Sequence, residues 1–383
     1  MRLTLSRPAW LTTVFGCLIL TATALPALRA EDQLIFISSF AAGDAGAIQA
    51  FHLDTEKGTL VRQARFAAVE NPFFLALSPD QKTLFSIHAV GTFGGGDDEF
   101  VMSLRIDDQN GKLTAINTQS SKGTASCYLD VSPDGKTVVV ANYSSGSVAS
   151  YAIGKDGALG KPASFVQHTG SSVDESRQKA PHAHCIVYSP NGKHVFAADL
   201  GTDKIVSYTV SDSKLKTSPH PFVRTTPGTG PRHLTFHPSG RSVYVVNEIG
   251  NTVTSYRYDA THGFLSEQQS ISTLPEEYEG TTHTADIKIT PNGKFLYATN
   301  RGHDSVAGYR VRDDGNLTLV NIEPSLGAGP QNLAIVADGK FLLCANLPGD
   351  NLSVFRIDQE SGRLTAVGTP VKIDKPSCIM VVR

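Results

Sequence analysis

Apolar and polar residues alternate along this chain in a unit that recurs about every fifty residues. Each unit contains two short alternating segments joined by a turn rich in Pro, Asp, Asn and Gly, which is the pattern of a β-hairpin. The six copies are LALSPDQKTLFSI (75–87), LDVSPDGKTVVVAN (129–142), IVYSPNGKHVFAAD (186–199), LTFHPSGRSVYVVN (234–247), IKITPNGKFLYATN (287–300) and LAIVADGKFLLCAN (333–346).

Two further alternating segments follow each hairpin, so each unit predicts four strands. The third strand leads to a large apolar residue, in chain order Leu104, Tyr151, Tyr208, Tyr256, Tyr309 and Phe355. The fourth begins at a leucine, in chain order Leu113, Leu159, Leu215, Leu265, Leu317 and Leu364.

The two ends of the chain complement each other. The N-terminal part contains QLIFISS, AIQAFHLD and GTLVRQARF but lacks a first strand, whereas the C-terminal KPSCIMVVR supplies only a first strand. Joined, they form a seventh unit, and a closed ring leaves no exposed sheet edge. The repeat therefore predicts an all-β fold: a single seven-bladed β-propeller of four-stranded blades over residues 31–383, closed by the C-terminal strand.

Residues 1–30 do not follow the repeat. Arg2 and Arg7 precede a mostly apolar run, and small residues follow up to Ala30. This pattern predicts a secretory signal peptide with cleavage after Ala24 or Ala30, and hence a periplasmic or secreted protein without a membrane span after cleavage. An uncleaved membrane anchor is the alternative, although the apolar run is short for a span.

Charge and cysteine content narrow the class of protein further. The net charge is -2 and no run of Lys or Arg stands out, so neither a nucleic acid nor an anionic membrane is predicted as a partner. Cleavage would leave four cysteines, all in predicted strands, which favours buried free thiols over disulfides. The sequence has no C-x-x-C motif, and neither a cofactor nor a metal is predicted.

Two positions of each unit lie at the same end of the predicted hairpin. Comparing the residues at these positions across the seven units identifies candidate site residues. The position six residues before the turn proline (Ala337 replaces this proline in the last hairpin) is occupied by Phe73, Cys127, His184, Arg232, Ala285, Gln331 and, in the closing strand, Ser377. The position after the second strand is occupied by Phe40, Ala89, Tyr143, Leu200, Glu248, Arg301 and Leu347. The residues with a charge or an imidazole are His184, Arg232, Glu248 and Arg301, and they fall in three consecutive units.

This set predicts a site at one mouth of the channel. Two guanidinium groups, a carboxylate and an imidazole can hold an anion or a polarised carbonyl and move a proton. Arg232 and Glu248 could instead form a purely structural ion pair.

Other polar residues have alternative readings. His182, His184 and Asp199 could bind a metal, but Asp199 occupies the slot held elsewhere by asparagines, where a turn-capping role is the simpler interpretation. His233 and Asp286 follow the first aligned position, and hydrogen bonding between blades is the simpler interpretation for them.

The sequence resembles the lactonase family of seven-bladed propellers, which includes bacterial 6-phosphogluconolactonases and the fungal carboxy-muconate lactonizing enzyme. The blocks that carry the resemblance are PHAHCIVYSPNGKHVFAADLGTDKI, GPRHLTFHPSGRSVYVVNE, ADIKITPNGKFLYATNRG and GPQNLAIVADGKFLLCAN. In the muconate branch a His, two Arg and a Glu form the site, and they match the four residues above. The resemblance implies a small-molecule lactone as substrate and no metal.

From these residues we expect a lactonase. Glu248 is expected to act as general base with help from His184, and Arg232 and Arg301 to stabilise the oxyanion. Gln331, His182 and Asp199 are expected to bind substrate. The reverse, lactone-forming reaction needs the same groups, and a secreted propeller that binds a ligand without turnover is a further alternative. The predicted signal peptide makes an unphosphorylated lactone at least as plausible a substrate as a sugar phosphate.

Overall fold

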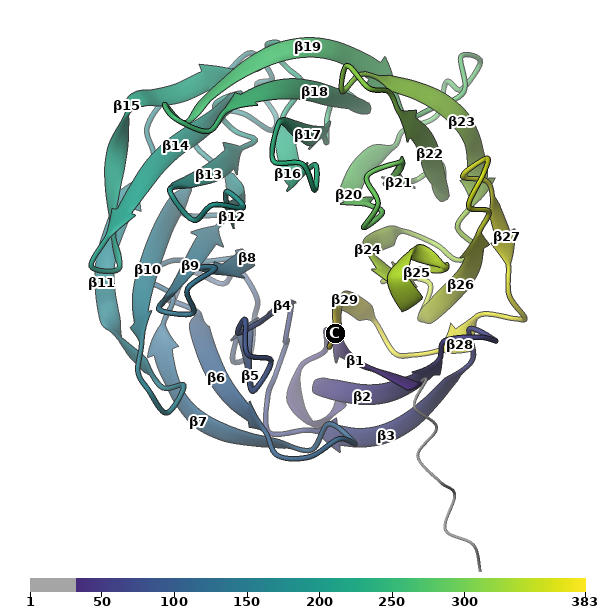
Figure 1. Cartoon of the computed structure of the whole chain (residues 1–383). Helices are drawn as coiled ribbons and strands as arrows, with labels where there is room; N and C mark the ends of the chain where they lie inside the picture. Colours follow the sequence, from purple (N-terminus) through teal and green to yellow (C-terminus); the bar gives the residue numbers. More distant parts are fainter. Residues whose placement is uncertain (1–31) are drawn as a thin grey trace, which may run out of the picture. The chain divides into compact units, whose positions relative to one another are not determined.

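The computed structural model describes residues 32–383, and the predicted signal peptide lies outside them. The described residues form seven antiparallel sheets arranged in a ring (Figure 1). The prediction of a seven-bladed all-β propeller is therefore confirmed. No helix within residues 32–383 is long and apolar enough to span a membrane.

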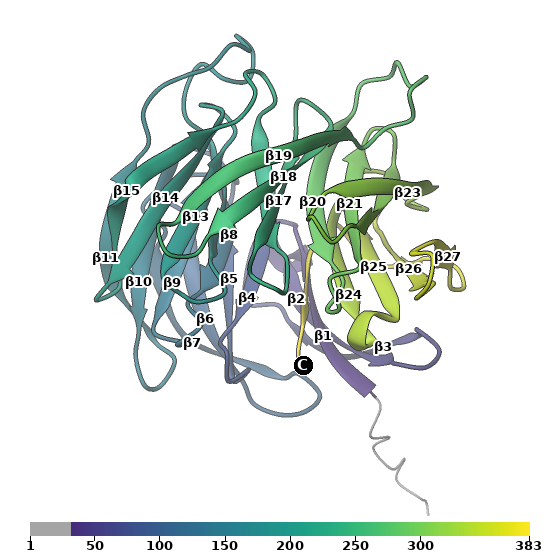
Figure 2. The ribbon, with the colours of Figure 1, turned by 45° about the horizontal axis from the view of Figure 1, so that its top comes forward.

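The first blade joins the two ends of the chain, as the sequence predicts. Its strand order is β29-β1-β2-β3, and Ile37 of β1 pairs with Ile379 of β29. Figure 1 shows the last strand beside the first, and Figure 2 shows the C-terminus next to β1. The strands of this blade are β29 (Pro376–Val381), β1 (Asp32–Ser39), β2 (Ala47–Asp54) and β3 (Leu60–Phe66).

The other six blades each follow chain order from the centre of the ring outward. Blades 2 to 4 contain β4 (Phe74–Leu77), β5 (Thr83–His88), β6 (Phe100–Ile106), β7 (Leu113–Ser120); β8 (Ser126–Val131), β9 (Thr137–Asn142), β10 (Ser147–Ile153), β11 (Leu159–Gln167); and β12 (Ala183–Tyr188), β13 (His194–Asp199), β14 (Lys204–Ser211), β15 (Lys214–Arg224).

Blades 5 to 7 repeat the same arrangement. They contain β16 (Pro231–Phe236), β17 (Ser242–Asn247), β18 (Thr252–Asp259), β19 (Phe264–Ser272); β20 (His283–Ile289), β21 (Phe295–Arg301), β22 (Ser305–Val311), β23 (Leu317–Pro324); and β24 (Pro330–Val336), β25 (Phe341–Asn346), β26 (Asn351–Ile357), β27 (Leu364–Ala366). In blade 7 a short strand, β28 (Val371–Lys372), also pairs with β26. Residues 32–383 also contain two 3₁₀ turns, Gly43–Ala45 and Ala337–Gly339.

The core lies between neighbouring sheets. The large apolar residues of the third strands are buried, with exposed fractions of 0 to 2% at Leu104, Tyr151, Tyr208, Tyr256, Tyr309 and Phe355. The four cysteines of the described chain are buried and free, as predicted. Burial raises the pKa of Cys185 and Cys378 to about 12, so these thiols stay protonated.

Three rings from different blades meet in the centre of the ring. Tyr128 of β8 lies 4.1 Å from Phe74 of β4 and 4.9 Å from His233 of β16, measured between ring centroids. Phe74 and His233 belong to blades 2 and 5, which are not neighbours, and their rings are 5.9 Å apart. The channel is therefore filled at this level. Toward the hairpin turns it widens again into a cavity of about 490 Å³.

The inner strands share one irregularity that positions the site. In six blades the inner strand has one more residue than its partner at the first aligned position of the repeat. In β12, Ala183 pairs with Asp199 and Cys185 with Ala198, so His184 is the extra residue. Such a β-bulge turns its side chain out of the regular alternation.

Candidate active site

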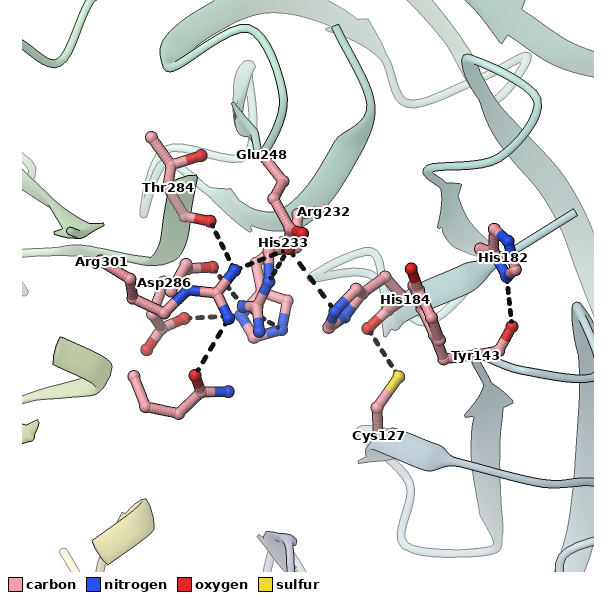
Figure 3. Close-up of polar contacts among 12 residues, drawn as sticks. Cys127, Tyr143, His182, His184, Arg232, His233, Glu248, Thr284, Asp286 and Arg301 are labelled. Atoms are coloured by element: carbon pink, nitrogen blue, oxygen red, sulfur yellow. Dashed lines mark hydrogen bonds and ion pairs between the residues drawn. The ribbon is translucent and has the colours of Figure 1, made fainter. Parts of the chain in front are cut away.

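The four charged or imidazole-bearing residues predicted from the repeat converge on one carboxylate (Figure 3). Oε2 of Glu248 lies 2.7 Å from Nε of Arg232 and 2.9 Å from Nη2 of Arg301. The same oxygen is 3.9 Å from Nε2 of His184. Blades 4, 5 and 6 thus place these side chains together at the end of the ring where the inner strands begin, here called the site mouth.

Local folding explains why residues sixteen positions apart meet. Arg232 lies in the bulge of β16, between the pairs Pro231–Asn247 and Leu234–Val245. Glu248 follows the last residue of β17, and its N–H donates to the carbonyl of Gly230 at 2.7 Å. Gly230 has a φ of +62°, and a Cβ there would lie 2.9 Å from a side-chain carbon of Ile249, so glycine suits this close turn.

A third arginine completes the ionic cluster, and the sequence comparison missed it. Nη2 of Arg177 lies 2.6 Å from Oε1 of Glu248 and 3.3 Å from the hydroxyl of Tyr143. Arg177 belongs to the long connection between β11 and β12, which has no counterpart in the other units. The only available signal was a basic residue in an unusually long loop.

Buried polar contacts hold this connection in place. Gln178 has no exposed surface, and its Nε2 donates to the carbonyl of Leu200 at 2.8 Å. Its Oε1 accepts the N–H of Asp174 at 3.0 Å. Ser172 donates to Asp203 at 2.6 Å. The loop that carries Arg177 is therefore fixed to blade 4 on both sides of the arginine.

The charges around Glu248 determine its protonation state. Burial acts to raise the pKa of Glu248, but Arg301 and Arg232 in particular lower it, and the net pKa lies well below the usual range. A carboxylate with so low a pKa is a weak base at neutral pH. This environment suits an anchor for three guanidinium groups better than the expected general base.

His184 is in the opposite electrostatic situation. Burial and the nearby charge of Arg232 lower its pKa well below 6.5, so the imidazole is neutral at physiological pH. Its Nδ1 is buried and has no hydrogen-bond partner among the described residues. His184 is thus a neutral imidazole with unused hydrogen-bonding capacity beside the arginines.

Arg301 has contacts beyond Glu248. Its Nη2 lies 3.4 Å from the carbonyl of Thr284, and its Nη1 lies 3.5 Å from Oε1 of Gln331. Within residues 32–383, Nε of Arg301 and Oγ1 of Thr284 are buried and unpaired. The structure therefore places the predicted substrate-binding residue Gln331 beside the cluster, together with two buried polar atoms that have no partner within the described residues.

The other two predicted substrate-binding residues are His182, which lies beside Tyr143, and Asp199, which is fully buried. His182 stacks on Tyr143, with ring centroids 4.5 Å apart, and Tyr143 in turn contacts His184. Asp199 is fully buried, and it accepts bonds from the N–H groups of His182 and Thr202.

The expected substrate contact of Asp199 thus finds no free carboxylate oxygen in this structure. Its other oxygen lies 2.6 Å from Nδ1 of His168, so both carboxylate oxygens are used within the protein. The turn-capping alternative describes this residue correctly.

The geometry of the donors also bears on the metal alternative. Nδ1 of His182 lies 3.0 Å from the carbonyl oxygen of Tyr143. One carboxylate oxygen of Asp199 lies 2.6 Å from Nδ1 of His168. Across residues 32–383, no three His, Cys, Asp or Glu side chains are arranged to hold a metal ion. The set His182, His184 and Asp199 therefore lacks the geometry of a metal centre.

One aligned position in each of blades 1 and 2 carries an aromatic residue, Phe40 in blade 1 and Phe73 in blade 2. Phe40 and Phe73 contact Phe93 from the glycine-rich connection after β5, and the three ring centroids are 5.1 to 5.2 Å apart. All three rings are partly exposed. The site mouth therefore has an ionic arc in blades 4 to 6 and an aromatic arc in blades 1 and 2.

Comparison with known proteins agrees with this architecture. The family model described as "Lactonase, 7-bladed beta-propeller" matches residues 34–381. A 6-phosphogluconolactonase from Bacillus subtilis (strain 168) is 34% identical over 90% of this chain and 97% of its own length.

Two solved structures are similar over nearly the whole fold. A putative 6-phosphogluconolactonase from Bacteroides fragilis has a TM-score of 0.86 at 34% identity, covering 94% of this chain and all of its own. A periplasmic gluconolactonase from Pseudomonas aeruginosa has a TM-score of 0.87 at 31% identity, covering 92% of this chain and 99% of its own. The chain therefore belongs to the lactonase family of seven-bladed β-propellers.

Proposed function

We propose that the protein hydrolyses a lactone at the site mouth, with His184, Arg232 and Arg301 as its catalytic residues and Glu248 as the residue that positions the arginines. The observation that carries the proposal is the convergence of three guanidinium groups on one carboxylate beside a neutral, incompletely bonded imidazole. Net positive charge favours the oxyanion that forms when a lactone carbonyl is attacked.

In this mechanism His184 is the general base. Its neutral imidazole takes a proton from a water molecule as the water oxygen attacks the lactone carbonyl carbon. Glu248, whose pKa is lowered by the arginines, keeps the guanidinium groups in place. This assignment exchanges the roles expected from the sequence, because a weakly basic carboxylate gives little help to an attacking water.

Arg232 and Arg301 stabilise the negative charge on the carbonyl oxygen in the tetrahedral intermediate. The intermediate collapses as the bond between the carbonyl carbon and the ring oxygen breaks, and the imidazolium of His184 returns its proton to that oxygen. The product is a hydroxy acid, which releases one proton to solvent at neutral pH.

An unphosphorylated aldonolactone in the periplasm is the substrate that we favour. The predicted signal peptide directs the chain out of the cytoplasm, and one structural relative is described as a periplasmic gluconolactonase. The aromatic arc offers a surface for the C–H face of a sugar ring, and Gln331 can orient a ring hydroxyl.

The test is to measure proton release at constant pH after glucono-1,5-lactone, 6-phosphogluconolactone or a muconolactone is added to the purified protein. We expect a rate above spontaneous hydrolysis, largest for the unphosphorylated sugar lactone. His184→Gln and Arg232→Ala should each lower kcat by about a hundredfold or more. Unchanged rates in both variants would exclude this site, and no rate with any lactone would favour a ligand-binding protein without turnover.

Arg177 provides a prediction that the sequence alone could not make. Arg177→Gln removes one of three cations around Glu248, so we expect kcat/KM to fall about tenfold. Lys179→Gln is the matched control, because Lys179 is exposed on the same loop. Equal effects of the two substitutions would contradict a direct role for Arg177.

A further inference from the structure

A buried pair, His233 and Asp286, continues from Arg232 into the channel, and the proposed mechanism leaves it unused. The exposed fraction of His233 is 2% and that of Asp286 is 0%. Nδ1 of His233 lies 2.9 Å from Oδ1 of Asp286, and its Nε2 lies 3.1 Å from Nη1 of Arg232 (Figure 3). One imidazole therefore connects a guanidinium of the site to a buried carboxylate.

These two contacts determine where the proton of His233 lies. The guanidinium of Arg232 can only donate, so Nε2 of His233 must be the acceptor. The single proton of the neutral ring is then on Nδ1, where the carboxylate of Asp286 accepts it. The other tautomer would place two N–H groups against each other at Arg232 and leave Nδ1 facing a carboxylate.

Asp286 is itself held by several donors. Nζ of Lys288 lies 2.6 Å from its Oδ2, and Nδ2 of Asn332 and the N–H of Leu333 donate to the same oxygen at 2.7 and 2.9 Å. Burial acts to raise the pKa of Asp286, but Lys288 and His233 reverse this effect and lower it. The carboxylate facing His233 is therefore ionised and fixed.

The surroundings of His233 keep its ring neutral. Burial is the main cause that lowers its pKa to about 3, and Arg232 and Lys288 act in the same direction while Asp286 opposes them. Three further rings surround it, those of Phe74, Tyr128 and His184. None of them supplies a second carboxylate that would favour an imidazolium.

We propose that His233, held in its Nδ1–H tautomer by Asp286, is a positioning residue that aims the guanidinium of Arg232 at the substrate. Nη1 of Arg232 donates to His233 and to the carbonyl of Ala285, while Nε donates to Glu248. Two sides of the guanidinium are thus fixed before substrate binds, as electrostatic catalysis requires. The catalytic consequence rests on the proposed function, but the tautomer does not.

The tautomer is tested by ¹⁵N NMR of protein labelled at its 12 histidines, with the His233 signals identified by their loss in His233→Gln. We expect a protonated Nδ1 and an unprotonated Nε2 from pH 8 to about pH 5. Nζ of Lys288 also lies 2.8 Å from Oδ1 of Asp286, and Arg232 still requires an acceptor at Nε2. Asp286→Asn should therefore weaken the preference for Nδ1–H without reversing it, so that part of the population carries the proton on Nε2. Lys288→Met is the control and should keep the Nδ1–H form. A protonated Nε2 in the unmodified protein would overturn the proposal.

The positioning role is tested by kinetics with the lactone hydrolysed fastest. His233→Phe fits among the neighbouring rings but offers no acceptor, so we expect kcat to fall about tenfold or more while KM changes less than about twofold. His233→Gln offers a carbonyl oxygen to Arg232 and should recover most of the loss.

A wild-type kcat in His233→Phe, or equal losses in both variants, would overturn the role. If no lactone is hydrolysed by the unmodified protein, the proposed function fails, and the NMR result alone decides whether His233 orients Arg232. The two failures are therefore distinguishable, because the NMR measurement needs no substrate.

Discussion

At the scale of single residues, the site depends on an excess of positive charge around one carboxylate. Arg177, Arg232 and Arg301 all contact Glu248, whose side chain is only 5% exposed. The carboxylate offsets repulsion among the arginines, and in the proposed reaction the surplus positive charge would stabilise an anionic transition state. The contribution of Glu248 to stability can be measured without a substrate.

Glu248→Gln should lower the free energy of unfolding by about 3 kcal/mol at pH 7, because it leaves buried arginines without their anion. The folded pKa of Glu248 lies below its unfolded value of 4.5. Its ionisation thus stabilises the fold above pH 4.5, and this contribution is lost as pH falls toward the folded pKa.

The stability gap between wild type and Glu248→Gln should therefore shrink below pH 4.5 by about 1.4 kcal/mol per pH unit. Urea denaturation at pH 7, 5 and 3.5 measures it. A constant gap over this range would mean that folding does not shift the pKa of Glu248, and a widening gap would mean that folding raises it.

At the scale of the elements, β-bulges and one long loop bring the residues together. The bulges give six of the seven inner strands one side chain outside the regular alternation, and His184 and Arg232 lie at two of these bulges. The loop between β11 and β12 adds Arg177 from outside the repeat. Strands of the scaffold thus hold most of the site, and one anchored loop completes it.

Gln178→Ala tests how this loop is held. Without the side chain, the carbonyl of Leu200 and the N–H of Asp174 lose buried partners, at a cost of about 1–3 kcal/mol. We expect faster amide hydrogen exchange within residues 170–181, unchanged exchange in the blades, and a lower kcat/KM. Exchange in Lys179→Ala, which alters an exposed neighbour, should match wild type. Unaltered loop exchange in Gln178→Ala would show that other contacts suffice.

The repeat explains which parts of the site could be predicted from the sequence. Seven aligned units supply their own comparison, so His184, Arg232, Glu248 and Arg301 stood out against apolar neighbours. Arg177 has no aligned position, and no comparison within the chain could select it. The bulges could not be predicted from the sequence either. In β12, for example, Ala183, His184 and Cys185 are all buried, and no Gly or Pro marks the extra residue.

Two roles expected from the sequence fit the folded contacts poorly, and each has a specific cause. Asp199 carries a charge, but asparagines occupy the same position in other blades, where they indicate turn capping. Glu248 is a carboxylate, but its basicity depends on three neighbouring positive charges that the sequence does not reveal. Hydrophobic pattern thus predicts strands and ring closure, but protonation states require the folded contacts.

At the scale of the whole molecule, the ring is closed by strands from opposite ends of the chain. Ile37 and Ile379 pair across this closure, and Ser38 and Ser377 are joined by a hydrogen bond of 2.8 Å. The closing strand also contacts the buried polar residues around Asp286. The N–H of Ile379 donates to Oδ1 of Asn332 at 2.8 Å, and Asn332 in turn donates to Asp286. Ser377 also donates to the carbonyl of Pro72, just before blade 2, at 3.1 Å. Loss of β29 would therefore affect blades 1, 2 and 7.

Deletion of residues 376–383 should prevent a stable closed ring. It exposes the inner edge of β1 and removes buried Cys378 and Ile379, at about 1.5–3 kcal/mol for each large apolar side chain. We expect aggregation or higher oligomers by size-exclusion chromatography and a lower melting temperature. A synthetic 376–383 peptide should partly restore both, and deletion of Arg383 alone should have little effect. A monodisperse truncated protein with the wild-type melting temperature would contradict this role.

The position of β29 also has a consequence for biosynthesis. A ribosome completes strands β1 to β3 early, but the strand that they require is made after all the others. The first blade therefore remains open while the rest of the chain is translated, and a polypeptide that stops before Pro376 can never close it. Ring closure thus distinguishes finished from unfinished chains, and an incomplete product keeps the exposed strand edge that chaperones and proteases recognise.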